Sequence, residues 1–256
     1  MHHLVLVPAG ERPELTADAL WLAGAVGVEE VADIIRGAFD DHERAGAAAK
    51  ALGGRVEPAA DDTGLDAWRD HATVHRAGPF LVRPPWLPSQ SGTTDLVLDP
   101  RHSFGSGSHP STQLALELLA AHVSPGEHVL DVGTGSGVLA IGAALIGAHV
   151  HAIDTDPGAA AAVDANAEAN GVASRINYAE TDARFAAGSF DLAVCNMTID
   201  LHELVGPALA ANTVAARLIV AGILVGDHED RARIAHERTE VHDRRVSGEW
   251  AALLLG

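Results

Sequence analysis

The sequence of 256 residues contains one cysteine and one lysine, and only 4% of its residues are aromatic. Cys195 alone cannot form an internal disulfide, which predicts a reducing compartment, the cytoplasm. The most apolar tract, 138–146, is far shorter than the ~20 residues of a membrane span, so we expect no membrane partner. The N-terminal stretch MHHLVLVPAGE lacks the basic and apolar regions of a secretory signal.

Positive charge is also scarce. The 17 basic residues are outnumbered by 35 acidic ones, which gives a formal net charge of −18 with neutral histidines. This balance argues against direct nucleic-acid binding through a basic surface and favours a basic or neutral partner. The sequence has no G-x-x-x-x-G-K-S/T, so a P-loop nucleotide site is excluded.

The feature that stands out is a glycine-rich turn between two short apolar runs. The first run ends in Asp131 and leads into GTGSG at 133–137, and an apolar stretch rich in Ala and Leu follows over 138–146. The second run, 150–153, ends in Asp154. This order predicts a βαβ unit in which the glycines allow a ligand to approach the backbone closely. An acid at the position of Asp154 can accept hydrogen bonds from ribose hydroxyls.

Two details of this turn favour S-adenosyl-L-methionine over a dinucleotide. Asp131 lies two residues before Gly133, where a carboxylate can meet a cationic amino-acid group rather than a pyrophosphate. The turn also lacks the third glycine at dinucleotide spacing, because Val138 and the residues after it are apolar. The plain alternative is an ordinary βαβ turn with no ligand, but three glycines between two acids exceed what such a turn needs.

The periodicity of the chain predicts two domains joined by a linker. Residues 1–58 are predicted to form a small α+β domain of ferredoxin-like type, and 59–95 the linker. This domain has no glycine fingerprint and no acid–base cluster, so we expect it to serve in recognition or scaffolding, with substrate recognition as our prediction. Within the small domain, we predict strands over 4–7, 31–39 and 55–58 and helices over 14–28 and 42–52.

Residues 96–256 are predicted to form an α/β domain of the Rossmann-like class. Strand and helix patterns alternate and close with two strand-like segments, which predicts a doubly wound, mostly parallel sheet with one antiparallel strand near its edge. Ligands of such sheets bind beyond the carboxyl ends of the strands. The polar residues predicted at these ends are Asp131, Asp154, Asp182 and Asn196.

A polar loop precedes the helix predicted to start at Pro110, for which Ser108 is the expected cap. This loop and the first turn carry Phe104, His109, Ser111 and Thr112. They can contact a ligand above the glycine turn, or they can simply cap a helix. The spacing favours neither interpretation.

The run LDPRHSFGSGSHPSTQLALELL resembles the signature LDPGxAFGTGTHPTT of the PrmA-type methyltransferases, which modify the large-subunit ribosomal protein eleven. The resemblance covers about 65–256, and the first sixty residues match only in general layout. It implies that Thr112, Gly133, Asp154 and Asn196 contact S-adenosyl-L-methionine, with Gly135 in the same turn. It also implies that Asp182 binds the adenine amine. Phe104 and His109 fall within the motif.

Two departures from the family pattern concern the acceptor. Asn196-Met197-Thr198 stands where the family has Asn-Ile-Leu, and 212–216 replaces a Lys-Pro-Gly-Gly turn. The resemblance implies N-methylation of lysine or amino groups in a basic ribosomal protein. The Asn196 amide and the Met197 carbonyl would orient the amine, without a strong base. Two rival functions remain: a small-molecule methyltransferase, which Met197-Thr198 favours, and a non-catalytic binding protein.

Overall fold

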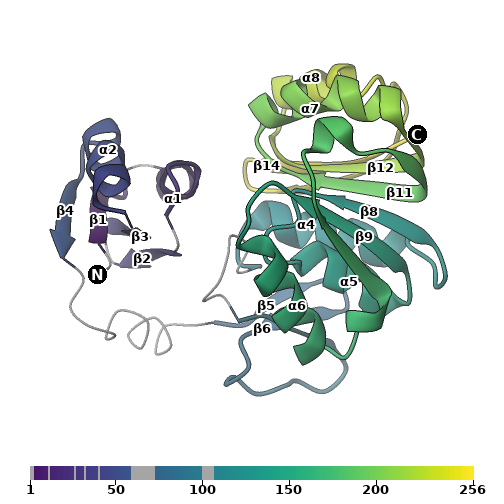
Figure 1. Ribbon diagram of the computed structural model, residues 1–256, viewed down its shortest axis with the longest axis horizontal. Coiled ribbons are helices and arrows are strands. Elements are labelled where there is room, and N and C mark those ends of the chain that lie inside the picture. The colour runs from purple at the N-terminus through teal and green to yellow at the C-terminus, as the bar shows by residue number, and fades with distance from the viewer. Residues whose placement is uncertain are drawn as a thin grey trace. The chain divides into compact units, whose positions relative to one another are not determined.

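The computed structural model describes residues 3–10, 12–25, 27–31, 33–39, 41–58, 73–99 and 107–256. Their contacts separate two compact units (Figure 1). The smaller unit takes in the described residues up to Pro58, and the larger unit takes in 73–99 and 107–256. Each unit has its own buried apolar cluster.

The smaller unit has the βαββαβ order of a ferredoxin-like fold. All neighbouring strands in its sheet, ordered β2-β3-β1-β4, are antiparallel. Two helices cover the buried residues of the sheet. The elements are β1 (His3–Pro8), α1 (Pro13–Leu22), β2 (Gly27–Val31), β3 (Ile34–Phe39), α2 (His42–Leu52) and β4 (Arg55–Pro58).

The sequence predicted α2 and β4 at their observed bounds. Asp41 caps α2 by accepting from the Arg44 N–H at 2.8 Å, and Gly53 ends it with φ +68°. Two predictions here were wrong. The helix predicted over 14–28 ends at Leu22, followed by Gly24 with φ +92°, and its predicted end overlaps the start of β2, which was not predicted. The strand predicted over 31–39 corresponds to β3, which starts only at Ile34. The unit therefore has four strands rather than three.

The larger unit contains the predicted doubly wound sheet, in the order β10-β9-β8-β11-β12-β14-β13. Only β14 runs against its neighbours, second from the edge, which confirms the predicted antiparallel strand. The strands are β8 (His128–Val132), β9 (His149–Asp154), β10 (Ile176–Glu180), β11 (Gly188–Asn196), β12 (Thr213–Leu224), β13 (Val241–Ser247) and β14 (Trp250–Leu255).

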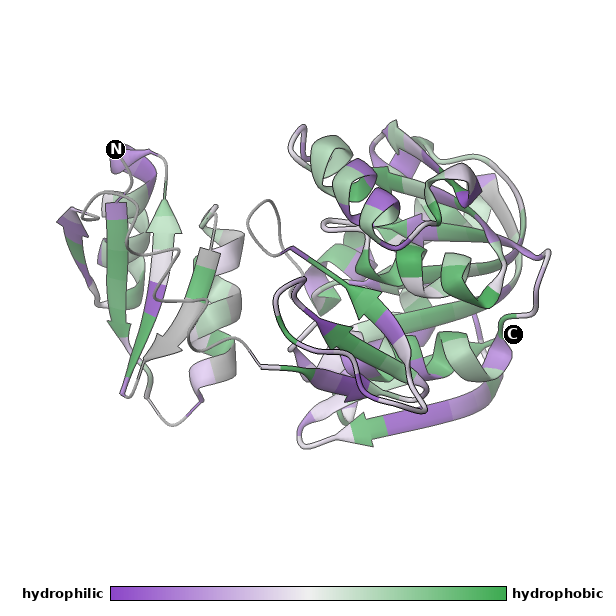
Figure 2. Ribbon diagram, turned by 90° about the horizontal axis from the view of Figure 1, so that it is seen from below, coloured by the Kyte–Doolittle hydropathy of each residue, from purple (hydrophilic) through white to green (hydrophobic). Residues whose placement is uncertain are grey.

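Helices cover both faces of this sheet. Figure 1 shows α7 and α8 above it and α4, α5 and α6 below it. Hydrophobic residues run along the central strands (Figure 2). The bounds are α4 (Pro110–His122), α5 (Val138–Ile146), α6 (Ala159–Ala169), α7 (Ile199–Asn212) and α8 (Asp227–Ala235), with short 3-10 turns η1 (Ala173–Arg175) and η2 (Ala183–Phe185). Among the described residues, no helix has the length and hydrophobicity needed to cross a bilayer.

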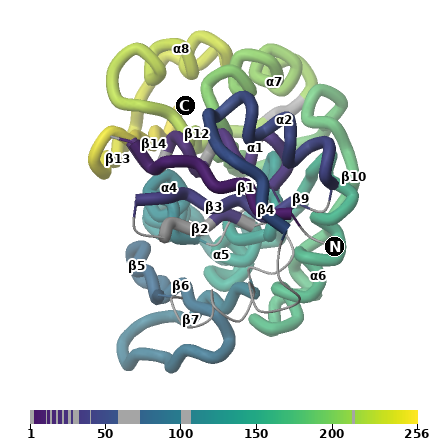
Figure 3. The backbone as a smooth tube through the Cα atoms, turned by 90° about the vertical axis from the view of Figure 1, so that its left-hand side faces the viewer, coloured from purple at the N-terminus to yellow at the C-terminus, as the bar shows by residue number. Residues whose placement is uncertain are grey.

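Part of the predicted linker, 59–95, belongs to the larger unit. Residues 75–97 form a small separate sheet of β5 (His75–Ala77), β6 (Phe80–Arg83) and β7 (Thr94–Val97), which lie side by side in Figure 3. Phe80, Leu81 and Val82 are all buried, so β6 is packed on both faces. The prolines that suggested a connector lie between β6 and β7, in the loop that joins two parallel strands. Residues 59–72 lie outside the described part of the chain.

Candidate active site

The candidate site lies at the carboxyl edge of the large sheet, where its strand order reverses. The chain passes from β8 outward to β9 and β10, and then returns to place β11 on the other side of β8. The register pairs Val132 with both Ile153 and Cys195, so the residues that follow these three positions share one edge. Asp154 and Asn196 are two of them. Such a reversal is where doubly wound sheets bind ligands.

The glycine turn after β8 has a backbone that residues with side chains rarely adopt. Gly133, Gly135 and Gly137 have φ of +71°, +52° and +81°. The N–H groups of Gly133 and Thr134 donate to the carbonyl of Ile153 at 2.9 and 3.0 Å, which ties the turn to the end of β9. The turn therefore offers backbone rather than side chains to a ligand.

Asp154 is held in one orientation by two backbone donors. Its Oδ2 accepts from the Gly135 N–H at 2.8 Å, and its Oδ1 accepts from the Asp156 N–H at 2.9 Å. Each carboxylate oxygen can accept more than one hydrogen bond, and Asp154 is only half-buried. A carboxylate fixed in this way can accept from a pair of neighbouring hydroxyls.

Asp131 stabilises the inside of the turn. It is 1% exposed, and its Oδ2 accepts from the Thr134 hydroxyl at 2.7 Å and from the Ala140 N–H at 3.0 Å. Burial raises the pKa of Asp131 to about 7, these two bonds oppose the rise, and the charge of Asp154 adds to it. The structure thus gives Asp131 a role in the shape of the turn. Its contact with a cationic ligand group stays a prediction.

Thr112 and Asn196, 84 positions apart, meet at this edge. Thr112 lies in the first turn of α4 and is 2% exposed, and the Asn196 Nδ2 donates to its hydroxyl oxygen at 3.1 Å. Because Nδ2 is the donor, the Oδ1 of Asn196 is the acceptor of this amide. The pair brings the start of α4 and the end of β11 together. The contact of both residues with the cofactor, which the resemblance implied, stays a prediction.

Met197 follows Asn196 at this edge and lies close to the glycine turn. Its N–H donates to the carbonyl of Ala221 at 3.1 Å, and its Cε lies 3.6 Å from the position that a Cβ on Gly133 would take. Gly222, with φ +79°, lies directly against the backbone of Met197, because a Cβ there would sit 2.8 Å from the Met197 carbonyl carbon. The Met197 carbonyl thus lies against Gly222.

Asp182, which follows β10, is already engaged by a basic side chain that the sequence analysis missed. Arg184 forms an ion pair with Asp182 at 2.6 Å, and its N–H also donates to the Asp182 carboxylate at 2.9 Å. These bonds lower the pKa of Asp182 to about 2. A ligand amine at Asp182 would share the carboxylate with Arg184. The spacing of the two residues, with Asp182 capping a short turn, is the signal that could have revealed the pair.

His109, rather than the predicted Ser108, caps α4. Its Nδ1 accepts from the Ser111 N–H at 3.2 Å, and its ring packs edge-on against Trp250 with ring centroids 4.4 Å apart. Burial lowers the pKa of His109 to about 4, so the ring is neutral at neutral pH. Phe104 lies outside the described residues.

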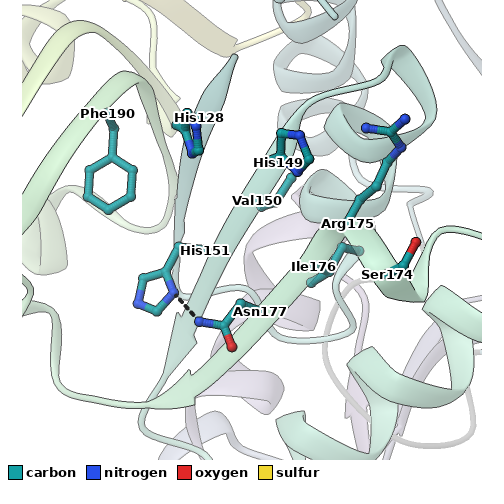
Figure 4. Close-up of a pocket in the computed structure, with 9 residues that line it drawn as sticks. All are labelled: His128, His149, Val150, His151, Ser174, Arg175, Ile176, Asn177 and Phe190. Carbon is teal, nitrogen blue, oxygen red and sulfur yellow. Dashed lines mark hydrogen bonds between the residues drawn. The ribbon is translucent and has the colours of Figure 1, made fainter. Parts of the chain in front are cut away.

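A separate pocket of about 280 Å³ opens at the opposite edge of the sheet (Figure 4). It is lined by residues at the starts of β8, β9, β10 and β11, among them His128, His149 and Phe190. His151 and Asn177 are joined there at 3.2 Å. Because parallel sheets of this type bind ligands at the carboxyl ends of their strands, this pocket is not the candidate active site.

Comparison with known proteins shows which family this chain belongs to. The sequence model of the ribosomal protein L11 methyltransferases (PrmA) matches residues 39–255. The chain belongs to the PrmA family. It is 37% identical to the ribosomal protein L11 methyltransferase of Thermus thermophilus over 78% of this chain and 80% of that one. It is 34% identical to the Deinococcus radiodurans protein of the same name, over 93% and 92% of the two chains.

A solved PrmA-type structure has the same fold. The ribosomal protein L11 methylase of Lactobacillus delbrueckii subsp. bulgaricus aligns with a TM-score of 0.59 at 27% identity, over 72% of this chain and 97% of that one. The family expected from the run LDPRHSFGSGSHPSTQLALELL is thus confirmed. The likeness also extends further than the sequence motifs suggested, because the alignment with the Deinococcus protein covers 93% of this chain and so reaches into the N-terminal unit.

Proposed function

We propose that this chain is an S-adenosyl-L-methionine-dependent protein methyltransferase that modifies the ribosomal protein L11. Its named relatives are ribosomal protein L11 methyltransferases. The observation that carries the proposal is the arrangement at the reversal of the sheet. There, the oriented Asp154 carboxylate and the Asn196–Thr112 pair lie at the same strand edge as the glycine turn.

The residues at this edge fit the cofactor. Gly133 and Gly135 offer backbone without side chains to a ligand. Both oxygens of the Asp154 carboxylate are held by backbone N–H groups. We propose that Asp154 binds the ribose hydroxyls, and that the turn and Thr112 hold the amino-acid part. When bound, the cofactor supplies a methyl group already activated on a sulfonium sulfur.

The task left to the protein is to orient the acceptor amine. A lysine amine has a pKa of about 10.4 in water and must lose a proton before it can attack. Partial burial disfavours the ammonium form. We assign the orienting acceptor to the Asn196 Oδ1. Because the Met197 carbonyl lies against Gly222, we propose that Met197 forms a wall of the site and contributes less to orientation than the sequence suggested.

We propose that the ferredoxin-like unit, 1–58, recognises the substrate and that 96–256 carries the chemistry. The formal charge of −18 suits a basic ribosomal protein, since opposite charges speed association. A protein substrate of the ribosome would also place the reaction in the cytoplasm, as the single cysteine predicted. Direct nucleic-acid binding is not part of this proposal.

The test is incubation with methyl-labelled S-adenosyl-L-methionine and purified ribosomal proteins. We expect label in L11, and amino-acid analysis of the hydrolysate should recover it as methylated lysine or methylated α-amine. Asn196→Ala serves as the low-activity control. Label in small metabolites and in no protein would instead support the rival methyltransferase, which Met197-Thr198 favours. Calorimetry that shows no cofactor binding would support a non-catalytic protein.

A further inference from the structure

Two histidines are buried behind the candidate site and contact each other. His202 lies on α7 and is 0% exposed, and His236 follows α8 and is 2% exposed. The His202 Nδ1 and the His236 Nε2 are 2.9 Å apart, and the His202 Nε2 lies 2.9 Å from the carbonyl oxygen of Ala221. Burial lowers the pKa of His202 to about 4 and that of His236 to about 3, so both are neutral at neutral pH.

The position of each proton follows from these contacts. A carbonyl oxygen only accepts, so the Nε2 of His202 must carry the proton that it donates to Ala221. A neutral imidazole has one N–H, which leaves the His202 Nδ1 as an acceptor. The His236 Nε2 must then donate to it. The result is a directed chain of hydrogen bonds from His236 through His202 to Ala221.

These hydrogen bonds end on the Ala221 carbonyl oxygen, which also holds the segment Asn196-Met197-Thr198 at the candidate site. The Ala221 carbonyl accepts from the Met197 N–H at 3.1 Å as well as from His202. The pairing of β12 with β14 shifts register between Val220 and Ile223, so Ala221 lies in an irregular part of its strand. His202 thus adds a second donor, from the side of α7, to the carbonyl that already accepts from the Met197 N–H.

The other end of this segment runs into the helix that carries His202. The Thr198 carbonyl accepts from the backbone N–H groups of Leu201 and His202, both at 3.0 Å, in the first turn of α7. The segment Asn196-Met197-Thr198 is thus fixed by the backbone of His202 at one end and by the shared Ala221 carbonyl in the middle. Gly206 permits the close packing of α7 on α8 that brings His236 within reach, because a Cβ there would lie 2.6 Å from the Ala235 carbonyl oxygen.

A purely structural role would not need this chemistry. The surroundings are apolar: buried residues of α7, α8 and β12 make up the cluster on this face of the sheet. A buried polar group is unfavourable unless it is fully hydrogen-bonded, and a leucine could fill such a place without that requirement. The hydrogen bonds of the two imidazoles end on the Ala221 carbonyl, which accepts from the Met197 N–H.

We propose that His202 and His236 are positioning residues for methyl transfer, which set the Asn196-Met197-Thr198 segment through the Ala221 carbonyl. The inference rests on the proposed function, since it is the Asn196 amide that meets the acceptor amine. Neither histidine touches the reacting atoms.

The experiment compares His202→Leu, His202→Gln and His236→Leu with Leu209→Ala as matched control. Leu209 lies on the same helix and in the same buried cluster, so its truncation lowers stability without touching Ala221. Gln can donate its Nε2–H to Ala221 from about the place of the histidine Nε2. The readouts are kcat and the cofactor Kd, together with amide hydrogen exchange at Met197 in the cofactor-free protein.

We expect His202→Leu to lower kcat by roughly ten- to a hundredfold with a cofactor Kd within about threefold of wild type, as small misplacements near a reaction do. His202→Gln should recover most of the loss. His236→Leu should lower kcat less, and hardly at all in the His202→Leu background, because coupled residues are non-additive. The Met197 amide should exchange faster in His202→Leu than in Leu209→Ala.

Equal kcat values in His202→Leu and Leu209→Ala, with equal exchange at Met197, would overturn the inference and leave the proposed function standing. If His202→Leu does not fold, His202→Gln and His236→Leu carry the same comparison. If the wild-type protein methylates nothing, the proposed function fails. The exchange at Met197 then still decides whether the two histidines hold the loop.

Discussion

Replacing Gly222 by alanine tests the packing that places Met197. Gly222 has φ +79°, and a Cβ added to it would lie 2.8 and 2.9 Å from the carbonyl carbon and nitrogen of Met197. These are backbone atoms, so they cannot swing aside as the end of a flexible side chain would. Gly222→Ala must therefore move either β12 or the segment Asn196-Met197-Thr198 at the end of β11.

The cost has two parts. A left-handed backbone conformation costs an L-residue about 1–2 kcal/mol relative to glycine. Forcing an extra carbon into a packed place costs about 1–3 kcal/mol more. The sum, about 2–5 kcal/mol, corresponds to a fall of roughly 4–20 °C in Tm for a domain of this size.

The assay is thermal unfolding measured by calorimetry, with Gly171→Ala as the control variant. Gly171 has a similar φ of +68°, but a Cβ there would meet nothing within 4 Å, so this variant carries only the conformational cost. We expect Gly222→Ala to lose clearly more in Tm than Gly171→Ala, and also to lose turnover. Equal Tm values in the two variants would refute the close contact between Gly222 and Met197.

Three further outcomes are expected. Asp154→Ala removes the oriented carboxylate and should raise the cofactor Kd about ten- to a hundredfold in a calorimetric titration. This factor corresponds to the about 1.5–3 kcal/mol that hydrogen bonds to a charged group contribute. An unchanged Kd would exclude Asp154 from the site. Asn196→Ala should lower kcat at least about tenfold while the Kd stays within about threefold, and equal turnover would remove Asn196 from the mechanism. The third concerns Asp131, whose pKa burial raises from 3.8 to about 7, so the folded chain keeps a proton that the unfolded chain releases. The wild-type unfolding free energy, measured by urea titration relative to that of Asp131→Asn, should therefore fall as pH rises between these two values, and a flat difference would contradict the assigned burial.

Local signals determined much of the fold. Helices α2 and α5 were predicted at their observed bounds, because each combines an apolar pattern with a glycine in left-handed conformation directly after it, Gly53 and Gly147. Where such signals were weak, prediction failed. The residues of β2 fell across the end of the predicted helix 14–28 and the start of the predicted strand 31–39, and β5 was not predicted beside the prolines of the linker, although the pattern there did indicate a strand over 80–83, the bounds of β6. Apolar runs this short do not reveal where one strand ends and the next begins.

The sequence by itself determined the class of the protein: a glycine turn after a strand, polar residues at strand ends, and the loop motif of the PrmA family. Only the tertiary structure decided which groups touch. It joined Asn196 to Thr112, gave Asp182 an arginine partner and linked His202 to the carbonyl that holds Met197. The physical reason is range: periodicity and capping act over a few residues. Hydrogen bonds between residues distant in the chain depend on sheet register and helix docking, which the whole core fixes together.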